Sequence, residues 1–228
     1  MLKKIYITFV FLVLAILFIS CSTIRQINPL SKGESSLTLS IGGPITQVGK
    51  TYIPLPLLSM GYNYGILDNL SIESGLNFLS AAYGVLHLDI GANYWLFFPK
   101  KFIPGIIISP QTFILTNFTS NGFRLYPDIG LTTYWEIKQN KYVYIGIDNW
   151  FEYHSYREDG NIQKHHWLIT PYLGINMGNK KWQGQAEIKW YVPNLVNNTR
   201  AIKNIGIGNY GVVGIFLGIN RTFGEIKK

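Results

Sequence analysis

Residues 122–138 read GFRLYPDIGLTTYWEIK, and taking every second position separates them into two sets. One set is Phe123, Leu125, Pro127, Ile129, Leu131, Thr133, Trp135 and Ile137. The other is Arg124, Tyr126, Asp128, Gly130, Thr132, Tyr134, Glu136 and Lys138. Because successive side chains of a β-strand point to opposite faces, the stretch predicts a strand with one apolar and one polar face. Globular strands average about five or six residues, and a strand crossing a bilayer needs roughly nine to eleven, so the length favours a membrane strand.

Similar stretches recur along the chain and predict ten strands. Their expected bounds are 36–46, 53–67, 70–80, 85–98, 102–118, 122–138, 141–156, 165–178, 181–194 and 209–223. The fifth stretch contains Pro104 and Pro110, which belong at an edge, a bulge or a strand end. Eight strands remain an alternative, because the least regular stretches can also be read as a periplasmic extension or a loop.

The connections between these strands alternate between short polar turns and longer segments. Turns at 67–69, 99–101, 139–140 and 179–180 are short, whereas 155–164 and 195–208 are long. Short turns at one end and longer loops at the other are typical of transmembrane barrels. We therefore predict an all-β fold, an antiparallel up-and-down transmembrane β-barrel over residues 36–228. An even strand number places both ends of the barrel on the periplasmic, short-turn side.

Alternation alone leaves open which face meets water. A lipocalin-like soluble barrel, binding a hydrophobic ligand in the periplasm, would bury the apolar faces, and a membrane barrel would expose them. The charges on the polar faces favour the membrane barrel, because a packed soluble interior would bury them at a cost. Aromatic residues recur near strand ends, at 94–95, 134–135 and 150, and are interpreted as interfacial girdles.

The first twenty residues, MLKKIYITFVFLVLAILFIS, combine two lysines with a fifteen-residue apolar run, which is typical of a signal peptide. The sequence Phe18-Ile19-Ser20-Cys21 follows, and Cys21 is the only cysteine of the chain. This tetrapeptide resembles the lipobox of bacterial lipoproteins, which implies lipidation of Cys21. Residues 21–35 are then expected to form a lipid-anchored tether in the periplasmic leaflet of the outer membrane of a Gram-negative bacterium.

Composition supports a membrane location. Charged residues make up 14 % of the chain and aromatic residues 15 %, whereas soluble domains average about 25 % charged residues. Without the two lysines of the signal peptide, 18 basic residues face 12 acidic ones. The lysines lie in short turns, which fits lipid head groups and not a nucleic-acid groove. The expected partners are outer-membrane lipids and a larger outer-membrane protein complex, with no nucleic acid.

Charged residues on the polar faces are expected to line the lumen and to pair with one another there. This expected lumen network comprises Glu73, Arg124, Asp128, Asp148, Glu187 and Lys189. The strand directions also place all four histidines near the extracellular rim. Candidate catalytic residues there are His87, Asp89, Glu152 and His154, a combination suited to general-base chemistry. This plan resembles the ten-strand outer-membrane proteases, although no protease motif matches residue by residue.

The sequence thus predicts a lipid-anchored outer-membrane barrel with a structural or accessory role in the membrane or in an outer-membrane complex. An outer-membrane hydrolase with a His/carboxylate site at the rim is the first alternative, and the soluble lipocalin-like barrel is the second. No metal site and no cofactor are expected, because the chain has no HExxH motif, no paired cysteines and no glycine-rich phosphate loop.

Overall fold

The computed structural model describes residues 24–82, 84–117, 122–156, 161–197 and 203–224. These residues form one sheet of eleven strands and one short helix. They are β1 (Ser35–Val48), β2 (Thr51–Pro54), β3 (Leu57–Leu67), β4 (Leu70–Asn77), α2 (Phe78–Ala82), β5 (Val85–Phe97), β6 (Gly105–Asn117), β7 (Gly122–Lys138), β8 (Lys141–Phe151), β9 (Trp167–Gly178), β10 (Trp182–Val196) and β11 (Tyr210–Phe223). Cys21 and the expected signal peptide lie outside the described residues.

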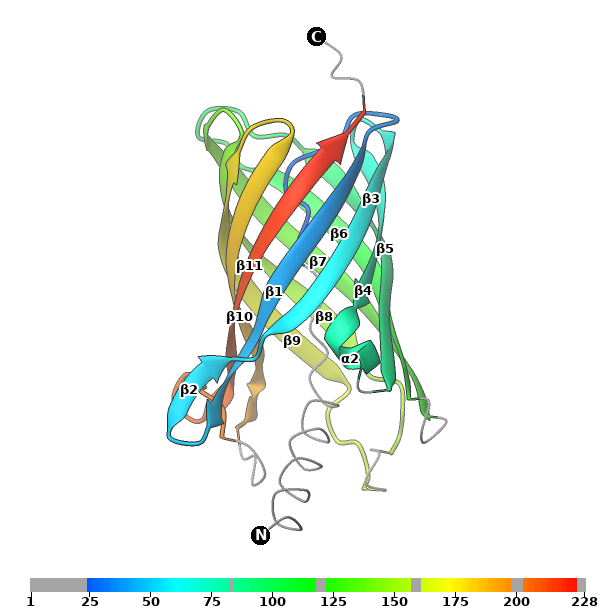
Figure 1. Cartoon of the computed structure of the whole chain (residues 1–228), viewed down its shortest axis with the longest axis vertical. Helices are drawn as coiled ribbons and strands as arrows, with labels where there is room; N and C mark the ends of the chain where they lie inside the picture. The colour runs from blue at the N-terminus through cyan, green and yellow to red at the C-terminus, as the bar shows by residue number, and fades with distance from the viewer. Residues whose placement is uncertain (1–23, 83, 118–121, 157–160, 198–202, 225–228) are drawn as a thin grey trace.

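Ten of these strands close into a barrel, which confirms the predicted fold class and strand number (Figure 1). Neighbouring strands pair antiparallel in chain order from β3 to β11, and β1 pairs with both β3 and β11. The closing pair runs from Ser35 opposite Phe223 to Pro44 opposite Gly214. The short strand β2 pairs only with the far end of β1 and extends it as a hairpin.

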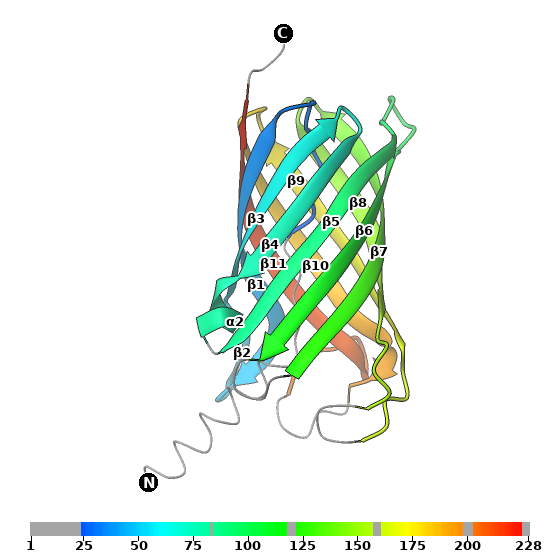
Figure 2. The ribbon, with the colours of Figure 1, turned by 90° about the vertical axis from the view of Figure 1, so that its right-hand side faces the viewer.

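The two ends of the barrel differ as the turn lengths predicted (Figures 1 and 2). The β3–β4, β7–β8 and β9–β10 turns lie at one end, here called the turn end, together with the start of β1 and the end of β11. The β2 hairpin, α2 and the described residues 152–156 and 161–166 lie at the other end, here called the loop end. The strand expected at 53–67 breaks at Leu55-Pro56, and residues 78–82 are helical where a strand was expected. No helix among the described residues is long and apolar enough to cross a membrane.

Apolar side chains cover the outside of the barrel. On β7, Ile129 is 52 % and Leu131 46 % exposed, whereas Thr132 is 1 % exposed. The same contrast recurs around the wall, where Ile90, Ile145, Leu173 and Leu217 all face outward. An outward apolar surface over closed antiparallel strands is the arrangement of a transmembrane barrel. The lipocalin-like alternative is wrong, since its interior would hold the apolar faces.

The aromatic girdle expected at the strand ends is partly wrong. Trp95 and Tyr134 are each 1 % exposed and Trp150 is 6 % exposed, so all three point into the lumen. Trp95 and Tyr134 belong to an apolar cluster with Ile107, Tyr142, Tyr144, Tyr172 and Ile27. All three residues occupy positions of the polar, inward-facing set of their strands. The alternation along a strand decides which way a ring points, and closeness to the strand end does not.

Pro110 interrupts the wall locally, as its residue type predicted. Pro110 pairs with Ile129 of β7. On its other side, the register would pair it with Ala92 of β5, but the ladder between β5 and β6 stops at Gly91 opposite Gln111. The pairs of β5 and β6 resume at Tyr94 opposite Ile108. Because proline has no backbone N–H, it cannot donate to a second neighbouring strand.

Residues 24–34 lie inside the barrel, which differs from the tether expected outside it. Ile27 is fully buried, Leu30 is 1 % exposed and Arg25 is 3 % exposed. The segment runs through the lumen toward the turn end, where Ser35 begins β1 (Figures 1 and 2). The lumen is therefore filled by a part of the chain that the strand pattern alone does not place there.

Candidate functional site

The segment 24–34, here called the luminal segment, is held by hydrogen bonds to the inner wall. Near its start, the Gln185 side chain donates to the Arg25 carbonyl at 2.8 Å, and the indole N–H of Trp95 donates to the Ile27 carbonyl at 3.2 Å. Tyr142 donates to Asn28 Oδ1 at 3.2 Å. These donors lie on β10, β5 and β8, so the segment is hydrogen-bonded to several sides of the lumen wall.

At the turn end, the luminal segment joins the β3–β4 turn through its backbone. The Gly33 N–H donates to the Gly65 carbonyl at 2.8 Å, and the Gly65 N–H donates to the Glu34 carbonyl at 2.9 Å. The Lys32 N–H donates to the Asp68 carboxylate at 2.9 Å. A Cβ on Gly65 would collide with the Ser31 carbonyl, so this close approach requires glycine.

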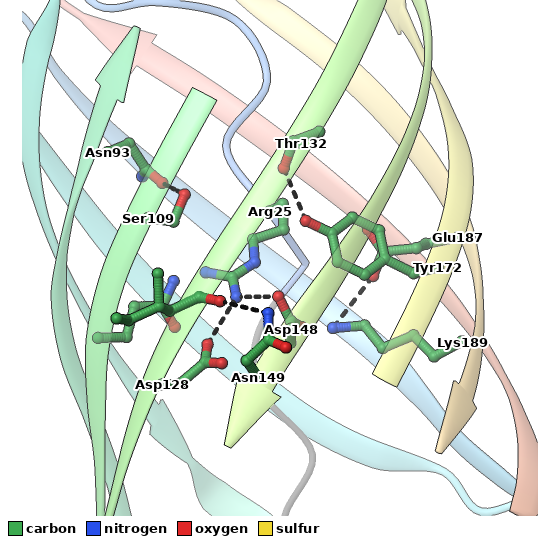
Figure 3. A network of polar contacts seen from close by, with 12 residues as sticks. Arg25, Asn93, Ser109, Asp128, Thr132, Asp148, Asn149, Tyr172, Glu187 and Lys189 are labelled. Carbon is green, nitrogen blue, oxygen red and sulfur yellow. Dashed lines mark hydrogen bonds and ion pairs between the residues drawn. The ribbon is translucent and has the colours of Figure 1, made fainter. Parts of the chain in front are cut away.

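Arg25 is the charged centre of the lumen (Figure 3). Its Nη2 donates to Asp148 Oδ1 at 2.5 Å and to Asp128 Oδ2 at 3.0 Å. Its Nη1 lies 3.6 Å from Glu73 Oε1. The guanidinium thus meets carboxylates from three strands, β4, β7 and β8. Gly130 makes room for it, since a Cβ at that position would lie 2.9 Å from Arg25 Nη2.

A second polar layer surrounds Glu73. The carboxylate accepts hydrogen bonds from Asn93 at 2.6 Å and from the side-chain amide of Gln111. Asn93 accepts in turn from the Ser109 hydroxyl at 2.7 Å. Buried polar groups need partners of this kind, because a lost hydrogen bond in the interior is costly.

Several buried polar atoms of the charged centre still have no hydrogen-bond partner within the chain. Among the described residues they include Arg25 Nε, Asp128 Oδ1 and Asp148 Oδ2. Polar atoms of this kind are usually satisfied by ordered water. The centre of the lumen is therefore a polar site with hydrogen-bonding capacity that the described side chains do not use.

The remaining charges of the expected lumen network form two separate groups. Lys189 Nζ lies 3.2 Å from Glu187 Oε1, both side chains being fully buried. Tyr144 donates to the other carboxylate oxygen of Glu187 at 2.9 Å. Arg124 lies apart from both, 3.3 Å from Glu152 at the loop end. The expected residues all face the lumen, but they make three clusters in place of one network.

At the loop end, the structure brings together two of the four candidate catalytic residues. His154 Nδ1 lies 2.8 Å from Glu152 Oε1, and the backbone N–H of His154 donates to the same oxygen. Glu152 is buried, whereas the His154 side chain is 39 % exposed. His166 bonds to the Glu152 carbonyl at 2.7 Å. The arrangement holds the segment after β8 in place, and one face of His154 stays open to solvent.

His87 and Asp89 lie elsewhere, buried on the inner face of β5. The His87 ring packs edge-on against Phe113, with ring centroids 6.0 Å apart. Phe113 stacks in turn on Trp150 at 4.2 Å. Among the described residues, the structure thus joins Glu152 with His154 and places His87 against Phe113. Among the described residues, no group of three or more His, Cys, Asp or Glu side chains is arranged to hold a metal ion.

Sequence reasoning missed the residues that fill the lumen. The sequence alone places Arg25, Ile27 and Asn28 in a polar tether, because a short segment with a proline and a glycine gives no periodic signal. One signal was present: the polar faces of the strands carry more carboxylates than basic residues. A buried excess of one sign calls for a counter-charge from outside the strands.

Comparison with known proteins gives structural likeness only. The translocator domain of the autotransporter NalP from Neisseria meningitidis shares 9 % identity, with 85 % of this chain and 90 % of that chain covered and a TM-score of 0.46. An outer membrane channel from Pseudomonas putida F1 shares 10 % identity, with 89 % and 100 % covered and a TM-score of 0.47. The outer membrane protein OprG from Pseudomonas aeruginosa shares 10 % identity, with 88 % and 100 % covered and a TM-score of 0.34.

At these identities and TM-scores the likenesses carry no argument about function. No protein-family model matches the chain. No curated protein matches it either. The class of protein is therefore defined by the barrel itself: a transmembrane β-barrel with an occupied lumen.

Proposed function

We propose that this protein is an outer-membrane β-barrel with a structural or accessory role in the membrane or in an outer-membrane complex. The observation that carries the proposal is the lumen: Arg25 closes its centre by pairing with Asp128 and Asp148. A barrel whose interior is filled by its own chain offers no open pathway for solutes. Its outward apolar surface is suited to outer-membrane lipids, the first expected partner.

Lipidation of Cys21 is the second part of the proposal, with the anchor in the periplasmic leaflet. It rests on the lipobox-like sequence Phe18-Ile19-Ser20-Cys21 and on the start of β1 at the turn end, the periplasmic side of such barrels.

The hydrolase remains a second candidate function because of one observation, the 2.8 Å contact between His154 Nδ1 and Glu152 Oε1. A carboxylate that orients an imidazole is the arrangement of a general base. His87 packs edge-on against Phe113, with ring centroids 6.0 Å apart. Replacing Glu152 and His154 together by Gln and Ala should abolish any hydrolytic activity while the barrel stays folded.

The proposed location and closed state are tested on membranes and on purified protein. We expect the protein in outer-membrane fractions, where the unheated form migrates faster on a gel than the boiled form. The mature polypeptide refolded without lipid should add no conductance to a planar bilayer. Recovery as a soluble protein, or a steady open conductance of the unlipidated chain, would contradict the proposal.

A further inference from the structure

The luminal segment is an insert and not a part of the wall. No residue from Ile24 to Leu30 belongs to a strand, and their contacts with the wall are side-chain hydrogen bonds and apolar packing. The described segment joins the barrel covalently only at Ser35. The ten-strand wall closes through β1 and β11 without it. The segment can therefore leave the lumen without breaking any pairing of the wall.

Departure of the segment would leave an acidic lumen. The inward carboxylates among the described residues are Glu73, Asp89, Asp128, Asp148, Glu152 and Glu187. They face three basic side chains, of which Arg124 and Lys189 are on the wall and Arg25 is on the segment. Without Arg25, six carboxylates would face two basic groups. A narrow lumen lined by one sign of charge favours ions of the opposite sign.

The vacated space would also be wide enough for ions. Ten strands about 4.8 Å apart and tilted by about 40° enclose a cylinder of roughly 10 Å backbone radius. The luminal segment, with the Arg25 side chain, occupies the centre of that cylinder. A space that admits a polypeptide chain admits water and a monovalent cation. Asp128 Oδ1 and Asp148 Oδ2, which have no partner within the chain, already mark polar positions along this path.

The charge and the width both point to a second, open state of the barrel.

We propose that the luminal segment is a releasable plug and that the unplugged barrel is a cation-selective pore. The inference rests on the proposed function, in which the seated segment closes the barrel. Arg25 then has two roles. It neutralises the carboxylates of the closed state, and its removal leaves Asp128 and Asp148 without this counter-charge in the lumen.

The test compares three refolded, unlipidated mature chains in planar bilayers: the unchanged chain, Arg25→Glu and Lys32→Glu. Arg25→Glu places a fourth carboxylate among Glu73, Asp128 and Asp148, which should expel the segment. Lys32→Glu makes the same charge change on an exposed side chain of the same segment and serves as the control. We expect channels from Arg25→Glu only, with K⁺ several-fold more permeant than Cl⁻ in a KCl gradient.

A heat-modifiable Arg25→Glu barrel that stays closed, or one that prefers Cl⁻, overturns the inference. If the unchanged unlipidated chain already conducts like Arg25→Glu, the closed state of the proposed function fails instead. Deletion of residues 24–32 provides a second open variant that carries no new charge, and Asp128→Asn with Asp148→Asn in that background should reduce the K⁺ preference several-fold.

Discussion

Arg25 Nη2 and Asp148 Oδ1 lie 2.5 Å apart in the centre of the barrel, although 123 residues separate them in the chain. The pair joins a segment before the first strand to the eighth strand of the sheet. A charge-assisted contact of this kind is stable in a buried setting only when its partners are hydrogen-bonded. It is the main polar link between the luminal segment and the wall, and it supports the following predictions.

Arg25→Ala should lower the free energy of unfolding in urea by roughly 3 kcal/mol, the lower part of the range for a broken buried ion pair. The cost stays low because water can enter the vacated lumen and hydrate Asp128 and Asp148. Unfolding of detergent-refolded protein, followed by the fluorescence of its tryptophans, measures the effect. Lys32→Ala, at an exposed position of the same segment, should leave the stability unchanged. An equal loss of unfolding free energy in Arg25→Ala and Lys32→Ala would mean that the Arg25 ion pairs do not stabilise the barrel.

Gly130→Ala should destabilise the barrel by about 1–3 kcal/mol, the usual cost of overpacking. The added Cβ would lie 2.9 Å from Arg25 Nη2 and 3.0 Å from Asp148 Oδ1. In the Arg25→Ala background the same change should cost less than about half as much, because the two sites share the contact. Gly184→Ala is the control, since the nearest atom to its Cβ would be 3.8 Å away. Additive effects of Gly130→Ala and Arg25→Ala on the free energy of unfolding would contradict a contact between Gly130 and the Arg25 side chain.

Charge on the outer face should be costly in proportion to its depth. Leu131→Arg, near the middle of β7, should destabilise the barrel in lipid vesicles by about 2–4 kcal/mol. Ile137→Arg, one residue from the turn end of β7, should cost only about 0–1 kcal/mol. Unfolding in urea from vesicles compares the two. If Ile137→Arg destabilised the barrel more than Leu131→Arg, the hydrocarbon core of the bilayer would not surround the middle of the strands.

Glu152→Gln should loosen the connection after β8. The Glu152 carboxylate accepts a hydrogen bond from Arg124 at 3.3 Å. It also lies 2.8 Å from the backbone nitrogen and 2.8 Å from the ring Nδ1 of His154. Loss of its charge weakens these bonds, so protease added to intact cells should cleave between residues 152 and 166 several-fold faster. His165→Ala, a change at an exposed neighbour, should not alter the cleavage rate. Unchanged cleavage in Glu152→Gln would mean that the carboxylate does not hold this connection.

The wall of the barrel could be predicted from the sequence because each strand carries its own signal. The bounds of β7 match the predicted 122–138, and the alternation assigns Ile129 outward and Asp128 inward correctly. Departures occur where local chemistry interrupts the pattern. Pro56 separates β2 from β3, and the strand expected at 141–156 ends at Phe151, before Glu152 turns to meet Arg124.

The contents of the lumen could not be predicted in the same way. Arg25 and Ile27 find their partners on β5, β7 and β8, and nothing in their own short segment records those distant contacts. The contacts of the candidate rim residues could not be predicted for a related reason. Strand direction places His87 near the loop end, but it does not show that the ring packs against Phe113 inside the lumen.

Thiol labelling at position 27 tests the central claim most directly, since Ile27 is fully buried in the lumen. In the refolded mature chain with Cys21→Ser, Ile27→Cys and Phe102→Cys each provide one thiol, and Phe102 is 93 % exposed. We predict that a water-soluble maleimide labels position 102 at once and position 27 only after boiling. Equally fast labelling of both positions in the unheated barrel would show that the luminal segment does not occupy the lumen.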